Sequence, residues 1–168
     1  MCPGGQVVAS ASEALGVVTN GMSLYARDSG VANSALVVSV GPDDFGTHPL
    51  DGVAFQRKWE HRAYVLGGSN YTGPAQTVGR FLGNSNGPSV REALHTYEPS
   101  IVDVDLHECL PTFVSDVLER ALPYWGRRIK GFDNPNICMT GIESRTSAPL
   151  RIQRDDSRMS PTVKGFYP

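Results

Sequence analysis

The sequence predicts an α+β fold, in which a mixed or antiparallel sheet packs against two main amphipathic helices. Runs rich in β-branched residues come first and last along the 168-residue chain, and two segments with helical periodicity lie between them. The apolar content of 40% is too high for intrinsic disorder. The length suits one domain, which we take as residues 1–168.

The first third of the chain is predicted to be rich in strands. Residues 6–21 hold two β-branched runs around a short polar bend, which is the pattern of a hairpin. Residues 35–40 (Ala-Leu-Val-Val-Ser-Val) form a third predicted strand. Residues 41–44 (Gly-Pro-Asp-Asp) end that strand as a turn.

Two helices are predicted from the spacing of apolar residues. Asp51 can cap the first helix, and the Gly-Gly pair at 67–68 ends it. Its apolar positions recur at spacings of 4, 4 and 3, at Phe55, Trp59, Ala63 and Leu66.

The second helix has Pro111 in its first turn, and we expect Pro123 to break or kink it. Its apolar stripe consists of Phe113, Val114, Val117, Leu118, Ala121 and Leu122.

Loops and further strands complete the predicted fold. Residues 69–99 are rich in Gly, Asn, Ser and Pro, so we expect mostly loop there, with a short element at 75–82. This region is expected to be the most mobile. Residues 131–135 predict a turn. Strand-like sequence follows at residues 137–146, 149–154 and 163–168.

Charge and hydropathy exclude several classes of partner. The net charge of −2 supplies no general field for nucleic acid or for an anionic membrane. No apolar run approaches the roughly 18 to 20 residues that a membrane helix needs, and the first residues do not resemble a secretory signal. We therefore expect no nucleic-acid or membrane partner and a cytoplasmic location.

The cysteines and histidines predict no metal site. Cys2, Cys109 and Cys138 are widely spaced and contain no CxxC pair, which argues against disulfides and zinc. Cys109 precedes a helix and is interpreted as a packed thiol. His107-Glu108 is not followed by a second histidine at metal-ligand spacing.

The chain also lacks a phosphate-binding loop. Neither GxGxxG nor GxxxxGK[ST] occurs in the sequence. In such loops, backbone N–H groups at a helix N-terminus bind the phosphates. A self-sufficient dinucleotide or nucleoside triphosphate site is therefore not expected.

Two polar clusters remain as candidate sites. The Asn20–Ser23 loop, with Arg27 and Asn33, can bind the polar edge of a ligand, or it is an ordinary turn-rich loop. Glu143 and Arg145 share one face of a predicted strand, with Arg151 a short distance along the chain. In a cleft they would orient an anionic or carbonyl substrate. On the surface they would form an ion pair worth under about 1 kcal/mol, and spacing alone favours the surface pair.

Several ordered segments resemble one protein family. They are residues 1–5 (Met-Cys-Pro-Gly-Gly), 17–23, 27–28, 32–37, 131–133 and 140–152, supported by 52–58 and 105–114. Together they resemble the uncharacterised FAD-dependent, NAD/FAD-utilising dehydrogenases of the two-dinucleotide-binding flavoprotein superfamily. The resemblance covers nearly the whole chain and weakens only at residues 83–102.

The resemblance implies that the chain is a substrate or cap domain of a larger FAD-dependent oxidoreductase and is inactive alone. FAD would be bound by the parent protein, whose FAD-binding segments are expected to lie on both sides, and not by this fragment. The implied partners are that FAD-binding domain and a small-molecule substrate, and a bare interface would favour self-association of the fragment. The alternatives are a stand-alone module that binds a small anion or a protein, and a structural domain for subunit contacts.

The resemblance also implies roles for individual residues. Arg27 and Arg145 would clamp an anionic or carbonyl substrate, Glu143 would orient Arg145, and Arg151 would lie in the same cleft. The residues expected toward the flavin are Cys2, Gly4, Gly5, Asn20, Ser23 and Thr146. The resemblance identifies neither a catalytic residue nor the substrate, because flavin itself performs the redox chemistry.

Overall fold

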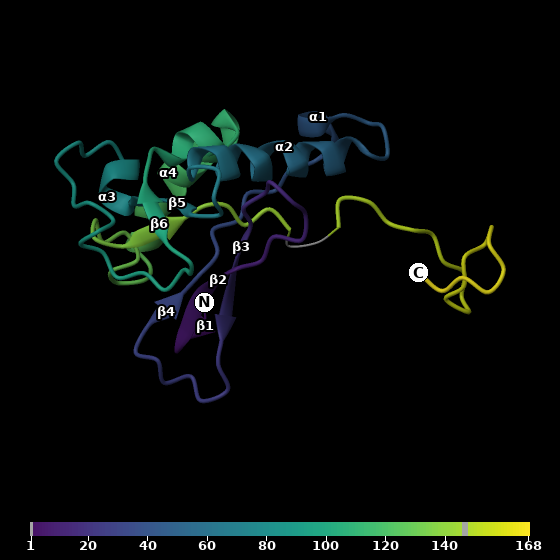
Figure 1. The fold of residues 1–168 in the computed structure, drawn as a ribbon, viewed down its shortest axis with the longest axis horizontal. Helices are drawn as coiled ribbons and strands as arrows, with labels where there is room; N and C mark the ends of the chain where they lie inside the picture. Colours follow the sequence, from purple (N-terminus) through teal and green to yellow (C-terminus); the bar gives the residue numbers. More distant parts are fainter. Residues whose placement is uncertain (1, 146–147) are drawn as a thin grey trace.

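Two long helices dominate the computed structural model, which describes residues 2–145 and 148–168 (Figure 1). They are α2 (Asp51–Leu66) and α4 (Thr112–Gly126). The shorter helices are α1 (Pro42–Phe45), α3 (Val78–Phe81) and the 3₁₀ helix η1 (Leu106–Cys109). Together with the strands they confirm the predicted α+β class.

The strands of the described residues form three small sheets. β1 (Cys2–Pro3) pairs antiparallel with β4 (Ala32–Asn33). β2 (Gly5–Ala9) pairs antiparallel with β3 (Thr19–Ser23), which confirms the predicted hairpin. In the third sheet, β5 (Gly73–Thr77) lies between a parallel β6 (Ile101–Asp103) and an antiparallel β7 (Cys138–Thr140).

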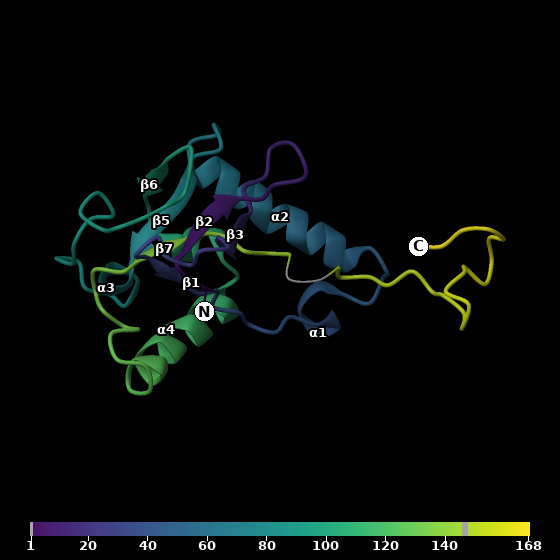
Figure 2. The same cartoon turned by 90° about the horizontal axis from the view of Figure 1, so that it is seen from below.

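The core lies between the two long helices and the β5 sheet. Figure 2 shows α2 and α4 lying apart, with β5 and β7 between them in that view. Every residue of β5 is buried. Phe81 and Leu122 are among the largest fully buried side chains, and each contributes roughly 1.5–3 kcal/mol by burial. The core therefore depends on a central strand in a region that was expected to be mostly loop with one short element at residues 75–82.

Three predicted strands are absent from the described structure. Residues 35–40 are extended but belong to no sheet, and no strand occurs in 149–154 or 163–168. A strand requires a neighbouring backbone to accept and donate its ladder hydrogen bonds. The strand predictions for these three segments are therefore wrong, because the described residues supply no partner backbone and residues 163–165 turn back instead, with Phe166 N–H donating to the Val163 carbonyl.

Two predictions about loops and prolines need correction. The short element expected at residues 75–82 is the central strand β5 followed by α3. Pro123 does not end α4, which continues to Gly126. Proline removes one helical hydrogen-bond donor, and α4 continues past it for three more residues before it ends.

The last residues leave the body of the molecule. Ala148 and Pro149 still lie against α2, and in Figures 1 and 2 the segment 151–168 then extends away from the helices and sheets. Its hydrogen bonds are internal, such as Ser160 N–H to the Phe166 carbonyl at 2.7 Å. The accessible surface of the chain is 10595 Å², whereas a compact monomer of this mass exposes about 8,100 Å². The chain thus exposes a large area that a self-contained domain would bury.

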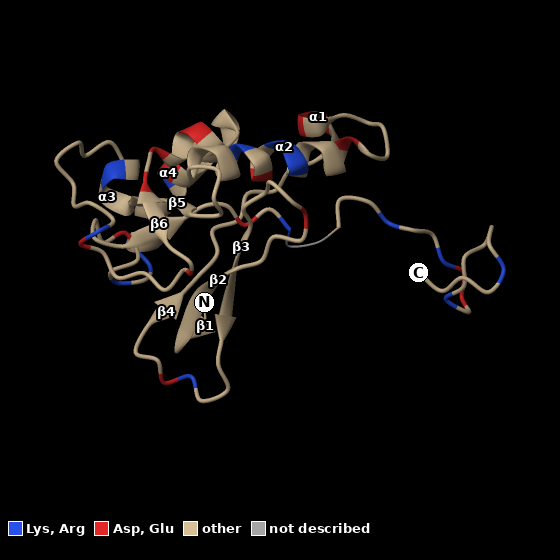
Figure 3. Cartoon of the chain, in the orientation of Figure 1, with Lys and Arg blue, Asp and Glu red and all other residues tan. Residues whose placement is uncertain are grey.

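The helices do not have the character of membrane spans. Among the described residues, none of them is both long and apolar enough to cross a bilayer. Figure 3 shows acidic and basic residues spread along α2 and over the loops.

Candidate functional site

A groove of about 1350 Å³ opens between α2, α4, the extended residues 30–42 and the loop before β7. Its floor is the apolar core, reached through Val114, Leu118 and Leu122 of α4. Phe55 and Trp59 of α2 line its side. Small-molecule sites typically occupy about 300–1,000 Å³. The groove is therefore large enough for a ligand, a segment of another domain, or both.

The lining of the groove is mainly apolar. Its charged or histidine side chains among the described residues are Glu92, His95, Lys130 and Glu143, and no arginine lines it. Partial burial raises the pKa of Glu143. Such a lining favours a mostly apolar molecule with a few polar atoms over a multiply charged anion.

Trp59 carries a hydrogen-bond donor without an acceptor. Its Nε1 atom is buried and has no hydrogen-bond partner among the described residues. An unpaired buried donor costs about 1–3 kcal/mol. An acceptor on a bound molecule or on a neighbouring polypeptide segment would remove that cost.

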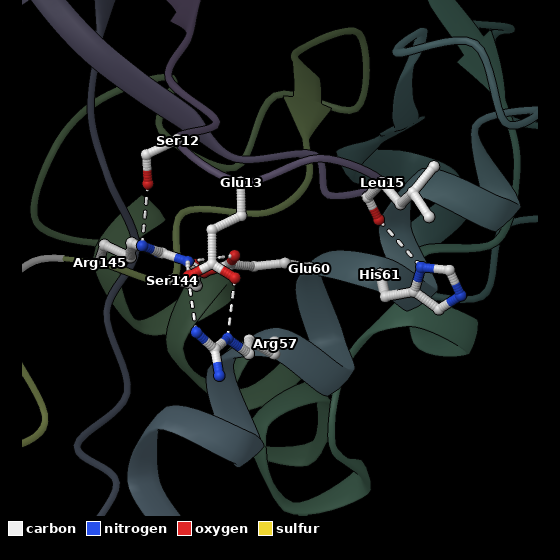
Figure 4. A network of polar contacts seen from close by, with 8 residues as sticks. All are labelled: Ser12, Glu13, Leu15, Arg57, Glu60, His61, Ser144 and Arg145. Atoms are coloured by element: carbon white, nitrogen blue, oxygen red, sulfur yellow. Dashed lines mark hydrogen bonds and ion pairs between the residues drawn. The ribbon is translucent and has the colours of Figure 1, made fainter. Parts of the chain in front are cut away.

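A buried ion pair joins Glu60 of α2 to Arg145 (Figure 4). Arg145 Nε donates to Glu60 Oε1 at 2.6 Å, and Nη2 donates to Oε2 at 2.7 Å. The Glu60 side chain is 3% exposed, and it accepts a third hydrogen bond from Ser144 Oγ at 2.6 Å. The hydrogen bond to Glu60 raises the pKa of Arg145. This bidentate geometry satisfies a buried carboxylate and fixes residues 144–145 on α2.

The ion pair extends into a surface network. Arg145 Nη1 donates to Ser12 Oγ at 2.9 Å, and Glu13 lies 3.5 Å from Arg145 Nη2. Arg57 binds Glu13 through two hydrogen bonds of 2.8 and 3.2 Å. The hydrogen bond from Arg57 lowers the pKa of Glu13. The bend between β2 and β3, helix α2 and residues 144–145 are thereby tied together beside the groove.

The predicted pair of Glu143 and Arg145 is not formed. The guanidinium of Arg145 is bound to Glu60, Ser12 and Glu13 instead. Glu143 lines the groove together with Asn20. The two residues are brought near each other because Thr19 N–H donates to the Ile142 carbonyl at 2.8 Å. Period-two spacing placed Glu143 and Arg145 on one face, but a buried carboxylate from a distant helix offers Arg145 the stronger partner.

Several of the other predicted site residues gather on the paired strands near the N-terminus. Gly5 lies opposite Ser23 in the β2–β3 ladder, and Ser23 Oγ donates to the Pro3 carbonyl at 3.0 Å. The Arg27 backbone packs directly against Gly4. Cys2 lies opposite Asn33 across β1 and β4. Cys2, Gly4, Gly5 and Ser23 therefore form one cluster with the Arg27 loop, in which Gly4 and Gly5 are buried. Asn20 of β3 lines the groove, and Arg145 belongs to the network on α2.

The glycines of this cluster form no open phosphate cradle. A Cβ atom on Gly4 would lie 1.9 Å from the Arg27 backbone, and one on Gly5 would lie 2.3 Å from the Met22 carbonyl oxygen. The space that a phosphate would need is filled by the chain's own backbone. Gly4 and Gly5 therefore do not fit the pyrophosphate of FAD, and we derive no chemical step through FAD from them.

Two predicted residues lie apart from both clusters. Arg151 is exposed in the C-terminal segment and lines neither the groove nor the Glu60 network. Thr146 lies outside the described residues.

Glu60, Gln56 and the place of Trp59 in the groove were not predicted from the sequence. Gln56 Nε2 donates to the Ser144 carbonyl at 3.0 Å, one turn before Glu60. The available signal was a carboxylate among the buried positions of an amphipathic helix, because such a group requires a partner. The partner itself is 85 residues away along the chain and was not visible in any local pattern.

The cysteines are free, and Cys109 is confirmed as a packed thiol. Burial raises the pKa of Cys109 to about 12. Burial also raises the pKa of Cys138. A thiol must ionise to act as a nucleophile, so neither of these residues is an activated cysteine.

Comparison with known proteins finds a matching family and a related protein. A family model described as "FAD-dependent protein, C-terminal domain-like" matches residues 1–146. An uncharacterised protein of Clostridium beijerinckii is 46% identical over 169 aligned residues, covering 100% of this chain. The chain spans 32% of the length of that relative.

Proposed function

We propose, on the premise that this chain belongs to the FAD-dependent protein, C-terminal domain-like family, that it is the substrate-side domain of a longer FAD-dependent oxidoreductase. In this proposal the FAD-binding domain of the same cytoplasmic protein holds the cofactor. This chain supplies the wall of the cleft in which a small molecule meets the flavin. FAD would supply the redox chemistry, and the described residues would bind and orient the substrate and exclude water.

The observation that carries the proposal is the large apolar groove in a chain that has no phosphate-binding loop motif. The groove supplies a binding surface, and the backbone that fills the space beside Gly4 and Gly5 supports the assignment of the cofactor to another domain. Asn20 and Glu143 supply polar groups at one wall. Cys2, Ser23 and the exposed Arg27, which was expected to clamp the substrate, become the proposed contacts with the FAD-binding domain, while the buried Gly4 and Gly5 shape the turn beneath them. Arg145 becomes a positioning residue for the segment that carries Glu143.

The stand-alone anion-binding module is not favoured. Arg145 is already bound to Glu60 and Ser12, and Arg151 lies in the C-terminal segment away from the groove. Arg27 is exposed in the separate cluster on the paired strands near the N-terminus. The three arginines therefore do not converge on one anion.

The decisive experiment is an FAD titration of the 168-residue chain and of the full-length protein, followed by flavin fluorescence and the visible absorption band. We expect stoichiometric binding by the full-length protein and none by the 168-residue chain. Tight binding by the chain alone would contradict the assignment of FAD to another domain.

A matched pair of variants tests the groove. In the full-length protein, Leu94→Trp adds bulk to an exposed residue of the groove, whereas Leu82→Trp adds the same bulk at an exposed residue outside it. The measured quantity is the rate at which added small molecules reoxidise the reduced flavin. We expect Leu94→Trp to lower this rate at least about tenfold at limiting substrate, with FAD content unchanged. Equal rates for the two variants would exclude this groove as the substrate site.

A further inference from the structure

Residues 34–40 form an extended segment that lacks a partner, and we call it the edge segment. It follows β4 directly, and its sequence of small and β-branched residues (Ser-Ala-Leu-Val-Val-Ser-Val) is typical of a strand. None of its backbone N–H or C=O groups makes a backbone hydrogen bond with the described residues. The pairing of β4 therefore stops at Asn33 although strand-like sequence continues to Val40.

The edge segment is already oriented like a strand with one buried face. Leu36 and Val38 pack against the core cluster. Ala35, Val37 and Ser39 are exposed, so burial alternates with period two over residues 35–39, while Ser34 and Val40 at the two ends are also exposed. This alternation fixes which side chains point inward. The backbone of the segment lies at the rim of the groove and is free to pair with another strand.

Nothing in the edge segment protects it as a free sheet edge. Exposed edges of native sheets usually carry charges, prolines or bulges that prevent pairing with another strand. Residues 29–41 contain neither a charged residue nor a proline, and this stretch is uniformly tan in Figure 3. An unprotected apolar edge of this kind is expected to be paired in the working protein.

We infer that the edge segment is the site at which an extended strand of the FAD-binding part of the longer protein adds to this domain. This inference rests on the proposed function. The related protein is about three times as long as this chain, so a large part of such a protein lies outside it and is available to supply the strand. Main-chain hydrogen bonds along residues 34–40 would provide the affinity, and alternate side chains would enter the groove.

The other candidate occupants are less well supported. Ala148 and Pro149 line the groove, but residues 151–168 bond among themselves and extend away from it. A second copy would have to pair through this short segment alone, which is far smaller than the interface of a stable dimer.

Hydrogen exchange measured by mass spectrometry tests the inference directly. We expect the amides of residues 35–40 to exchange about a hundredfold more slowly in the full-length protein than in the 168-residue chain, with α2 amides protected in both. Equal exchange of residues 35–40 in the two proteins would overturn it. Protection of residues 35–40 in the monomeric 168-residue chain would also overturn it, because the added strand would then come from residues 148–168. Protection that depends on protein concentration and dimer formation would overturn it as well, because the strand would then come from a second copy.

A matched pair of variants adds a second test in the full-length protein. Val37 is 67% exposed, so its replacement removes little packing within this domain. Val37→Pro deletes one N–H and should raise the exchange rate of neighbouring amides at least about tenfold, whereas Val37→Thr should not. Unchanged exchange of the neighbouring amides in Val37→Pro would count against the inference. If that variant does not fold, the comparison of the unaltered full-length protein with the 168-residue chain tests the inference instead.

FAD content is measured in the same samples to separate the two proposals. Bound FAD with unprotected residues 35–40 would overturn the strand addition alone. Failure of the full-length protein to bind FAD would overturn the proposed function, whatever the exchange rates.

Discussion

At the residue scale, Glu60 and Arg145 hold two distant parts of the chain together. Glu60 is the buried carboxylate, and Arg145 is about one-third exposed. Loss of one partner of a buried pair leaves the other charge without compensation. The consequences of deleting either member are therefore expected to be unequal.

We predict that Arg145→Ala lowers the free energy of unfolding by about 3 kcal/mol, because the Glu60 carboxylate stays buried with Ser144 as its main donor. Glu60→Gln should cost less, since the freed guanidinium can turn toward solvent. Urea unfolding measures both. Arg57→Ala, at an exposed member of the same network, is the control and should change the midpoint far less. Similar losses in all three variants would contradict a special role for the buried pair.

A second residue-scale feature is a histidine between two carboxylates. His107 Nδ1 lies 2.6 Å from Asp105 Oδ1, and Nε2 lies 3.0 Å from Glu119 Oε1. The ring also stacks on Phe81, with ring centroids 4.3 Å apart. Burial opposes protonation, but the hydrogen bonds to Asp105 and Glu119 outweigh it and raise the pKa of His107.

This arrangement predicts a pH-dependent stability. The protonated form is favoured in the folded state, so its contribution is complete below the unfolded pKa of about 6.5 and is lost as pH rises through the raised folded pKa. We expect Tm to fall over that interval, by an amount that is reduced in His107→Gln. Scanning calorimetry between about pH 5.5 and 8.5 measures it. An identical pH profile in His107→Gln would show that other groups are responsible.

At the element scale, the paired strands near the N-terminus depend on the close approach of two backbones. Gly4 has a φ of +58°, and a Cβ atom there would collide with the Arg27 backbone at 1.9 Å. Gly30 has a φ of +75°, but a Cβ atom there would meet nothing within 4 Å. The two glycines share the same conformational demand and differ in the space around them.

This difference gives a controlled prediction. Gly30→Ala should cost only about 1 kcal/mol, the strain of a left-handed residue, whereas Gly4→Ala should also separate β1 and β4 from the loop at Arg27. Amide exchange of residues 2–9 and 31–33 should therefore rise in Gly4→Ala and remain unchanged in Gly30→Ala. Unchanged exchange in both variants would show that the turn adapts by moving the Arg27 loop.

At the scale of the whole molecule, the chain exposes more surface than its mass requires. The excess over a compact monomer is roughly 2,500 Å², and the C-terminal residues 148–168 contribute to it. Exposed apolar side chains in that segment include Ile152, Val163, Phe166 and Tyr167. These features are typical of a domain whose partner surface is uncovered.

Small-angle X-ray scattering tests this description. A compact domain of 168 residues has a radius of gyration of about 15 Å. We expect a clearly larger value for this chain, and a decrease toward about 15 Å when residues 149–168 are removed. A value near 15 Å for the intact chain would mean that the segment folds back onto the body in solution.

The sequence by itself determined the features that depend on local periodicity and local chemistry. The two helices, the first hairpin, the α+β class and the buried thiol of Cys109 were all predictable because each rests on the spacing or type of neighbouring residues. The family resemblance likewise followed from ordered local motifs.

Only the tertiary structure decided which segments find partners. Residues 35–40 have the sequence of a strand but are unpaired, whereas the less strand-like residues 73–77 become the buried central strand. Arg145 bonds Glu60, 85 residues away, and not Glu143 beside it. In each case the outcome depends on which backbone or charge lies nearby in space, and no local pattern in the sequence records that distance.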